Sequence, residues 1–397
     1  MIQRDLYINR IKPYINQNLI KVLTGQRRVG KSFVLQLLAE EIRKEFPSSN
    51  IIFIDKEKYS FDFMRSHAEL MEFINAHKTD GTNYLFIDEV QEIDGFERVL
   101  RSLNSDPNFD IYCTGSNAQV FSSELATYLS GRQIVFHIGS LNFNEFCAFH
   151  KMQANQESLS NYILYGGLPY MVHLPDDIDI RFEYLNNMYS TILFRDVVRR
   201  HQIRDTRFLN DLIKFLADNT GSIFSANKIS AYLKNQKINK NVALILDYIS
   251  YIEGAYFINK VQRLDIVGKR HFEVGEKYYF EDIGLRNAIV GFNVNDMGQI
   301  IENLVYLHLR NMQFNIRIGE MDGHEIDFVA ERKGETVYIQ VAYKLNDSNT
   351  IEREFGNLLK IADNYPKYVI SYESFSPPNT YKGIQHQTLL QFLSSSI

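Results

Sequence analysis

The stretch at positions 25–32 has the residue types and spacing that most directly suggest chemistry: it reads Gly-Gln-Arg-Arg-Val-Gly-Lys-Ser. Glycine at both ends permits backbone conformations closed to other residues, so the N–H groups of residues 27–32 can surround a phosphate. Lys31 is then expected to reach the β- and γ-phosphates of a nucleoside triphosphate, and Ser32 to give its hydroxyl to Mg2+. The predicted nucleotide-binding residues are Gly25, Gln26, Arg27, Arg28, Val29, Gly30, Lys31, Ser32 and Phe33.

A pair of carboxylates, Asp88 and Glu89, follows the apolar run Tyr84-Leu85-Phe86-Ile87. The pair comes about 55 residues after the phosphate-binding sequence, with a strand and a helix expected between them. Asp88 is expected to hold Mg2+, directly or through water, and Glu89 to orient and deprotonate the attacking water as the catalytic base. A surface acid pair after a core strand is the alternative interpretation.

Two further positions are candidates for catalysis. Asn117 follows the apolar run 110–115, where it would sense the γ-phosphate or position water; Ser116 is the second choice. The alternative is that Ser116 caps a helix. Arg132 is either an arginine finger that stabilises charge on the transferred phosphoryl group or a surface arginine. For Arg27 and Arg28 the backbone is expected to matter, with solvated side chains.

The elements that must position these residues alternate along the first part of the chain. The apolar runs that indicate strands are 19–24, 50–55, 84–87, 110–115 and 133–138. Helical patterns occupy 2–17, 32–45 and 61–77. Strands that alternate with helices predict an α/β fold, a parallel sheet with helices on both faces. The carboxyl ends of such strands meet the ligand crevice beside the phosphate loop.

Four motifs, taken in order, carry a family resemblance: G-Q-R-R-V-G-K-S, F-I-D-E-V-Q, C-T-G-S-N-A and L-S-G-R. Together they resemble an AAA+ type P-loop ATPase of the bacterial and archaeal branch whose C-terminal half is a domain of unknown function. Residues 165–169 also resemble the Y-G-G-[FL]-P signature that follows the ATPase core in that branch. The resemblance implies ATP and Mg2+ as cofactors, and rings in which an arginine such as Arg132 acts on a neighbouring subunit.

The resemblance and the element pattern divide the chain into four expected parts. These are an ATPase domain at 1–155, a helical linker at 156–205, a winged-helix-like α+β domain at 206–290 and a nuclease-like α/β domain at 291–397. The linker's long helix, 180–203, has a basic end at 195–201 that either touches nucleic acid or is a solvated helix C-terminus.

Three helical patterns followed by two strand patterns suggest the winged helix. Its third helix would face DNA, with Asn239, Lys240 and Asn241 near its start. Residues 242–249 are mostly apolar and acidic, so packing against a neighbouring domain is the equal alternative.

The last part resembles the PD-(D/E)XK nuclease fold through Glu302 on a helix and Asp327 on a strand. The third motif departs from that pattern, because Gln340 and Ala342 replace the acid and the lysine. Lys344 lies two residues farther along and would share the strand face. Without both groups, metal affinity and base catalysis are lost together, so a degenerate recognition module is favoured over a working nuclease.

Composition sets the remaining limits. The 397 residues are 45% hydrophobic and 23% charged with a net charge of −5, which gives no global attraction to nucleic acid or anionic lipid. Cys113 and Cys147 argue against a disulfide scaffold or zinc site and favour the cytoplasm. The sequence shows neither a signal peptide nor an apolar run long enough for a membrane span.

The leading hypothesis is therefore a Mg2+-dependent ATPase that couples its nucleotide state to C-terminal recognition domains. The alternatives are an ATP-regulated DNA-binding or DNA-processing protein and a slow nucleotide-dependent switch. A protein partner at the C-terminal domain and nucleotide-dependent homo-oligomers are the other expected associations.

Overall fold

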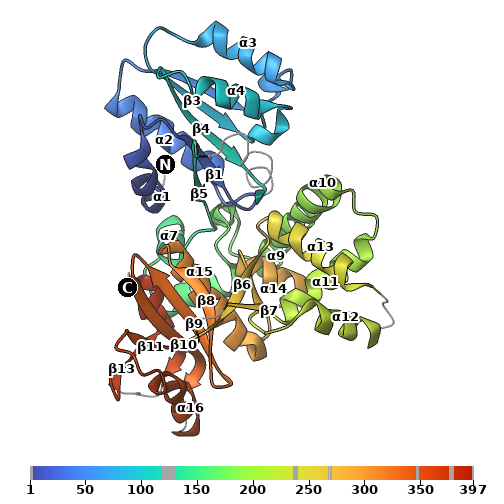
Figure 1. Cartoon of the computed structure of the whole chain (residues 1–397), viewed down its shortest axis with the longest axis vertical. Helices are drawn as coiled ribbons and strands as arrows, with labels where there is room; N and C mark the ends of the chain where they lie inside the picture. The colour runs from blue at the N-terminus through green and yellow to red at the C-terminus, as the bar shows by residue number, and fades with distance from the viewer. Residues whose placement is uncertain are drawn as a thin grey trace. The chain divides into compact units, whose positions relative to one another are not determined.

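The computed structural model describes residues 3–118, 131–235, 240–266, 268, 271–345, 348–374 and 380–395. The chain divides into two compact units (Figure 1). Unit 1 comprises Met1–Gly139 with Gly254–Tyr256, and unit 2 comprises Ser140–Glu253 with Phe257–Ile397. Among the described residues, no helix has the length and apolar character to cross a bilayer.

Unit 1 is built on a five-stranded sheet in the order β2-β3-β4-β1-β5, and every neighbouring pair is parallel. The strands are β1 (Ile20–Thr24), β2 (Asn50–Asp55), β3 (Asn83–Asp88), β4 (Phe109–Gly115) and β5 (Gln133–His137). The helices are α1 (Asp5–Ile11), α2 (Lys31–Glu45), α3 (His67–His77) and α4 (Phe96–Leu103). Figure 1 shows α1 and α2 on one face of the sheet and α3 and α4 on the other. The predicted parallel α/β fold is confirmed.

The sheet order explains how distant motifs meet in unit 1. Because all five strands run the same way, the residues that follow β1, β3 and β4 gather at one edge of the sheet. β4 lies between β1 and β3, so its last residues separate the phosphate-binding sequence from the Asp88–Glu89 pair. That edge therefore collects three of the four motifs.

Unit 2 begins with helices α7 (Phe143–His150), α8 (Gln156–Tyr165) and α9 (Ile178–Thr191). The long helix expected at 180–203 is interrupted, since α9 passes into a π-helix (Ile192–Val198) and then α10 (Arg199–His201). The ring of His201 stacks on that of Tyr251 at 3.8 Å between centroids, whereas Arg195 and Arg199 in the same basic end are exposed.

Three helices and a hairpin follow in the predicted order: α11 (Thr206–Asp218), α12 (Ala226–Asn235), α13 (Val242–Gly254), β6 (Ile258–Asp265) and β7 (His271–Phe280). The hairpin is also one end of an eight-stranded sheet, ordered β12-β13-β11-β10-β9-β8-β6-β7. The remaining strands are β8 (Asn315–Met321), β9 (His324–Arg332), β10 (Glu335–Leu345), β11 (Lys367–Ser374), β12 (Thr380–Tyr381) and β13 (Ile384–Thr388). The remaining helices are α14 (Ile283–Val290), α15 (Met297–Asn311), α16 (Ser348–Leu359) and α17 (Leu389–Ser394).

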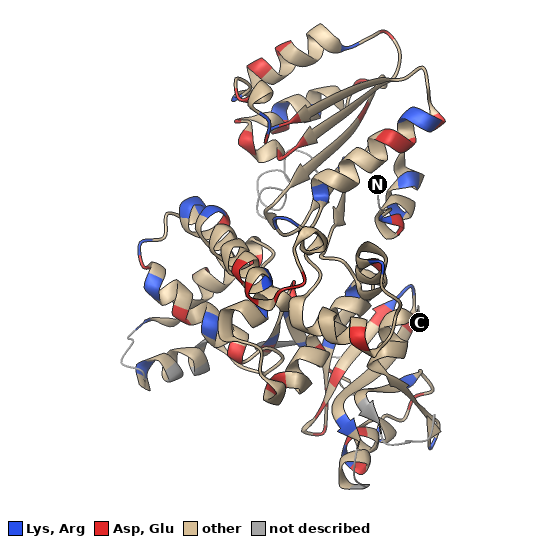
Figure 2. Cartoon of the chain, turned by 180° about the vertical axis from the view of Figure 1, so that it is seen from behind, with Lys and Arg blue, Asp and Glu red and all other residues tan. Residues whose placement is uncertain are grey.

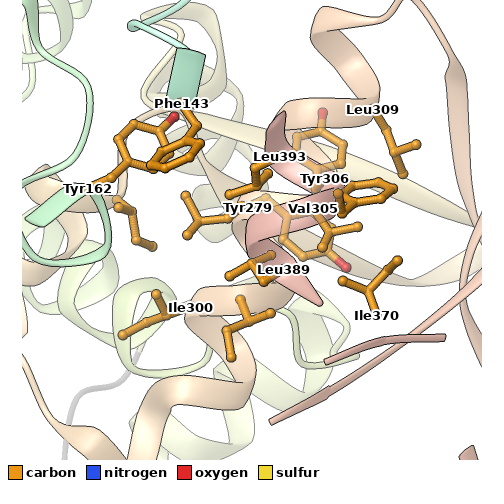
Figure 3. Packing of buried hydrophobic residues seen from close by; sticks show 14 of the residues in the cluster. Phe143, Tyr162, Tyr279, Ile300, Val305, Tyr306, Leu309, Ile370, Leu389 and Leu393 are labelled. Atoms are coloured by element: carbon orange, nitrogen blue, oxygen red, sulfur yellow. The ribbon is translucent and has the colours of Figure 1, made fainter. Parts of the chain in front are cut away.

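One hydrophobic core joins the parts of unit 2 that the sequence divided at positions 155, 205 and 290. Figure 3 shows Phe143 and Tyr162 packed in the same cluster as Tyr279, Tyr306 and Leu393. Phe143 comes from the end of the expected ATPase domain, and the other side chains come from the linker, the hairpin and the C-terminal part. Because they bury their surfaces against one another, these four segments contribute to one compact unit where the sequence suggested separate parts.

The two cysteines have the same character in both units. Cys113 lies in β4 and Cys147 in α7, and both are free, buried thiols. Burial raises the pKa of each thiol above its ordinary value, so neither is poised for reaction.

Candidate functional site

The loop between β1 and α2 depends on glycine at two positions. Gly25 has φ of +145°, and a Cβ at this position would stand only 2.1 Å from the carbonyl oxygen of Ile138. Gly30 has φ of +97° and is the N-cap residue directly before α2. The first glycine permits a close approach of two backbones, and the second permits a turn that side chains rarely allow. The sequence between them therefore forms a tight concave loop at the start of a helix.

Lys31 lies inside this loop. Its side chain is buried, and its Nζ donates to the carbonyl oxygens of Gly25 and Gln26 at 3.1 and 3.0 Å. The same Nζ lies 3.9 Å from Oε1 of Glu89. The ammonium thus stands between the loop and the carboxylate pair, where it can contact an anion bound by the loop.

Gln26 is the loop residue with the most unusual surroundings. Its side chain is fully buried, and neither Oε1 nor Nε2 finds a hydrogen-bond partner among the described residues. An amide buried in this way costs of order 1–3 kcal/mol. Such a side chain fits a site that a polar ligand completes.

Asp88 ends β3 and is held by two hydroxyl groups. Thr114 Oγ1 donates to Asp88 Oδ1 at 2.5 Å, and the Ser32 side chain is also hydrogen-bonded to this carboxylate. Burial raises the pKa of Asp88, and the nearby charges of Glu89 and Asp55 add to the rise, against the two hydroxyl bonds. The Ser32 hydroxyl and an Asp88 oxygen are neighbouring hard oxygen ligands, the kind that Mg2+ prefers.

Glu89 adopts φ of +53°, so the backbone leaves the extended conformation of β3 at this residue. Its N–H donates to Thr114 Oγ1 at 2.8 Å, and its carboxylate accepts from Gln91. Burial alone would raise the pKa of Glu89, but the charges of Lys31 and Arg27 outweigh it. The net pKa lies below the ordinary value, so Glu89 is ionised at neutral pH and can accept a proton.

The sequence interpretation missed the parts played by Thr114, Gln91 and the side chain of Arg27. Arg27 was expected to be solvated, yet it is 5% exposed, with Nη1 3.5 Å from Oε1 of Glu57. Arg28 is exposed, as expected. Thr114 and Gln91 lie inside the quoted motifs C-T-G-S-N-A and F-I-D-E-V-Q, which is the signal that could have identified them.

Ser116 and Asn117 follow β4, and both side chains are fully buried. The Ser116 hydroxyl is hydrogen-bonded to the Glu89 carboxylate and lies 3.4 Å from Nε2 of Gln91. The structure thus joins Ser116, the second choice of the sequence interpretation, to Glu89. Residues 119–130, where the alternative helix would continue, lie outside the described part of the chain.

Arg132 lies far from the loop of its own chain. It is exposed and precedes β5, and its carbonyl oxygen accepts from the N–H of Ile20 at the start of β1. Because β5 is parallel to β1, Arg132 stands at the amino edge of the sheet and the loop at the carboxyl edge. Five residues of strand separate the edges by about 16 Å. Arg132 therefore does not reach the loop of its own chain, and a finger acting on a neighbouring subunit or a surface arginine are the interpretations that remain.

In unit 2, the structure brings Glu302 and Asp327 together around a lysine that the sequence interpretation missed. Lys277 Nζ lies 2.8 Å from Glu302 Oε1, 2.6 Å from Glu325 Oε1 and 3.8 Å from Asp327 Oδ1. The Tyr279 hydroxyl donates to Glu302 at 2.6 Å. The sequence signal for Lys277 is its position directly before the apolar run Tyr278-Tyr279-Phe280 in an expected strand.

The other nuclease-like positions take different places. Gln340 Oε1 accepts from the N–H of Asp327 at 3.4 Å, whereas Lys344 Nζ lies 4.8 Å from the ring centre of Tyr343. Lys277 therefore takes the place at the carboxylates that was expected for Lys344. Burial alone would lower the pKa of Lys277, but Glu302, Asp327 and Glu325 raise it above its ordinary value. Across the described chain, no group of three or more His, Cys, Asp or Glu is arranged to hold a metal ion.

The residues expected at the start of a DNA-facing helix make contacts within unit 2. Lys240 Nζ pairs with Asp205 Oδ2 at 2.5 Å and lies over the Phe208 ring. Asn241 Oδ1 accepts from the N–H of Leu244 at 2.7 Å and so caps α13. Asn239 lies outside the described residues.

Comparison with known proteins finds two family models that match parts of the chain and two relatives that match most of it. Residues 17–147 match an AAA domain, and residues 156–296 match a domain of unknown function, DUF8612. A protein of Haemophilus influenzae is 32% identical over 380 residues, covering 94% of this chain and 93% of its own. A protein of Methanocaldococcus jannaschii is 33% identical over 372 residues, covering 89% of this chain and 80% of its own. Both are described as uncharacterized.

Among solved structures, the Aeropyrum pernix ORC1 protein in complex with DNA overlaps 73% of this chain and 92% of its own, with 11% identity and a TM-score of 0.31. The replication initiator DnaA bound to AMPPCP and single-stranded DNA overlaps 62% of this chain and 86% of its own, with 15% identity and a TM-score of 0.33. Similarity at this level is too low to transfer a ligand or a partner.

Proposed function

The chain belongs to the family of these Haemophilus and Methanocaldococcus proteins, with an AAA domain in its N-terminal part, and on that premise we propose that it is a Mg2+-dependent ATPase. One observation carries the proposal. The loop and the acid pair converge, with Ser32 hydrogen-bonded to Asp88 and Lys31 3.9 Å from Glu89. A phosphate-binding loop, two oxygen ligands and an ionised base are the groups that phosphoryl transfer to water requires.

Each residue has a distinct role in this proposal. The loop N–H groups and Lys31 bind and orient phosphate oxygens, and Ser32 with Asp88 would hold Mg2+ through oxygen atoms. Bound Mg2+ and ATP supply charge neutralisation and the phosphoryl group. Glu89 accepts the proton of the attacking water on a carboxylate oxygen, and the bonds from Gln91 and Ser116 fix the direction of that carboxylate.

The proposal is tested by measuring ATP binding and hydrolysis with the same preparations. Lys31→Ala is expected to abolish measurable ATP binding, because it removes the cation beside the loop. Glu89→Gln should retain binding but lower the hydrolysis rate by about 10²-fold or more, since it removes the base. Glu92→Gln, an exposed glutamate in the next turn, is the matched control and should hydrolyse ATP like the wild type. Equal rates for Glu89→Gln and the wild type would refute the assignment of the base.

For unit 2 we propose recognition of a protein partner, not nucleic-acid cleavage. The carboxylates that would bind a metal ion are paired with Lys277, and the third motif has no charged group at Gln340 or Ala342. Lys240 and Asn241 already make contacts within the unit. In the view of Figure 2, Lys and Arg are interspersed with Asp and Glu over both units. Such a mixed distribution does not favour binding to the phosphate backbone of a nucleic acid.

A further inference from the structure

Arg4, at the start of α1, is buried against the phosphate-binding loop. Only 1% of its surface is exposed. Nη1 donates to the carbonyl oxygen of Val29 at 2.7 Å, and both Nη1 and Nη2 lie 3.2 Å from the carbonyl oxygen of Gly139. The guanidinium also lies 4.6 Å from the ring centre of Tyr7. A side chain near the N-terminus therefore holds the backbone of the loop from outside.

The hydrogen bond from Arg4 to the Val29 carbonyl also fixes the direction of the next N–H group in the loop, that of Gly30. In a trans peptide the C=O of one residue and the N–H of the next point in opposite directions. Val29 turns its carbonyl toward Arg4, so the N–H of Gly30 must point away from α1. The N–H of Gly30 is among those expected to bind phosphate. Gly30 has φ of +97° and no Cβ that would limit its backbone conformation. Arg4 supplies the restraint that the glycine lacks.

The carbonyl of Gly139, the second hydrogen-bond acceptor for Arg4, holds the guanidinium in place. Gly139 gives its carbonyl to Arg4 and its N–H to the Tyr7 hydroxyl at 3.0 Å. The preceding residue, Ile138, donates its N–H to the carbonyl of Thr24 at 2.7 Å. The segment after β5 is thus tied both to the end of β1 and, through Arg4, to the middle of the loop. A planar guanidinium can serve two carbonyls at once, whereas a lysine ammonium is a single point on a flexible stem.

We propose that Arg4 is a positioning residue for phosphate binding: it orients the Val29–Gly30 peptide so that the Gly30 N–H faces the bound phosphate. The inference rests on the proposed nucleotide binding. It adds a residue outside the loop, 25 positions away in sequence, that sets the geometry of the loop. Its guanidinium keeps its charge when buried, so it also contributes a fixed positive charge beside the loop.

The test compares three variants for ADP affinity by calorimetry and for the Gly30 amide signal. That signal is found by NMR on protein labelled with 13C-valine and 15N-glycine, which restricts the spectrum to the Val–Gly pairs at 29–30, 267–268, 274–275 and 290–291. Arg4→Met should weaken ADP binding by about tenfold or more and move the Gly30 amide in the ADP complex. Arg4→Lys should recover only part of the affinity. Arg10→Met is the matched control, since Arg10 lies on the same helix over the Phe136 ring, and its affinity should stay within about twofold of the wild type.

The outcomes separate the inference from the function on which it rests. If the wild type binds ADP and both Arg4 variants bind it equally well with an unchanged Gly30 amide, the role of Arg4 is wrong and nucleotide binding stands. Lower thermal stability with unchanged ADP affinity would show that Arg4 only supports the fold. If the wild type binds neither ADP nor ATP, the proposed function fails, and with it the phosphate role of Arg4. Should Arg4→Met not fold, Arg4→Lys alone decides.

Discussion

At the residue scale, the candidate site contains two neighbouring carboxylates with opposite pKa shifts. Burial raises the pKa of Asp88, whereas Lys31 and Arg27 overcome burial and lower the pKa of Glu89. The two acids therefore lose their charges at different pH values as the solution is acidified. Groups with separated pKa values can take separate roles, here a metal ligand and a base.

The separation of the pKa values of Asp88 and Glu89 predicts a pH dependence for Mg2+ binding. Protons compete with Mg2+ for Asp88, so Mg2+ affinity at saturating nucleotide should fall on the acid side at the raised pKa of Asp88, while Glu89 remains ionised. Thr114→Val removes a hydrogen bond that lowers the pKa of Asp88, so its acid limb should move to higher pH. Calorimetric Mg2+ titrations across pH measure the acid limb of the wild type and that of Thr114→Val. An acid limb that is the same in Thr114→Val and the wild type would contradict the role of Asp88.

The same shift fixes the sign of the contribution of Asp88 to stability. Its folded pKa lies above the unfolded one, so the folded protein binds more protons between these values. Ionised Asp88 therefore costs stability at neutral pH, and the cost is relieved as the pH falls through the raised pKa. The opposite holds for Glu89, whose lowered pKa adds stability that is lost as the pH falls through it.

At the scale of elements, unit 2 is held by a charge cluster that links β7, α15 and β9. Lys277 is 2% exposed and reaches carboxylates on the other two elements. A buried ion pair is weak evidence of net stabilisation, but breaking it by removing one partner is costly, because the remaining charges stay buried and unpaired.

We expect Lys277→Met to lower the free energy of unfolding by about 3–5 kcal/mol, measured by urea denaturation. Lys344→Met is the control on β10, where Lys344 lies over the Tyr343 ring outside the cluster, and a cost below about 1 kcal/mol is expected. Adding Glu302→Gln and Asp327→Asn to Lys277→Met should recover part of the loss, since these changes remove the unpaired charges. A Lys277→Met protein as stable as the Lys344→Met control would show that the cluster does not hold the unit together.

At the scale of the whole molecule, the position of Arg132 constrains assembly. This exposed arginine stands at the sheet edge opposite its own loop, so it can act as a finger only on a second copy of the chain. A finger contributes of order 10³-fold or more to hydrolysis.

Mixing two variants tests this trans role. Arg132→Ala and Glu89→Gln should each hydrolyse ATP slowly alone, and the mixture should regain activity, because some interfaces then pair a working base with a working arginine. Sedimentation with ATP, with ADP and with neither gives the assembly state in parallel. A monomer under all three conditions, or a mixture no faster than its components, would remove Arg132 from catalysis.

The sequence by itself determined the groups at the carboxyl edge of the unit 1 sheet. Gly25, Gly30, Lys31 and Ser32 form a local pattern, and Asp88 with Glu89 closes an apolar strand. The alternation of strands and helices implied a parallel sheet, and a parallel sheet brings such segments to one edge. These features follow from short-range spacing, so a single sequence is enough to predict them.

Only the tertiary structure decided which distant side chains meet. Lys277 joins Glu302 and Asp327, and Arg4 reaches Val29 and Gly139 across 25 and 135 positions. The joined core of unit 2 likewise overrode the division expected from its local patterns. Such contacts depend on the packing of the whole chain, because the burial of many apolar side chains determines where each polar side chain lies. The local spacing of residues in the sequence does not contain this information.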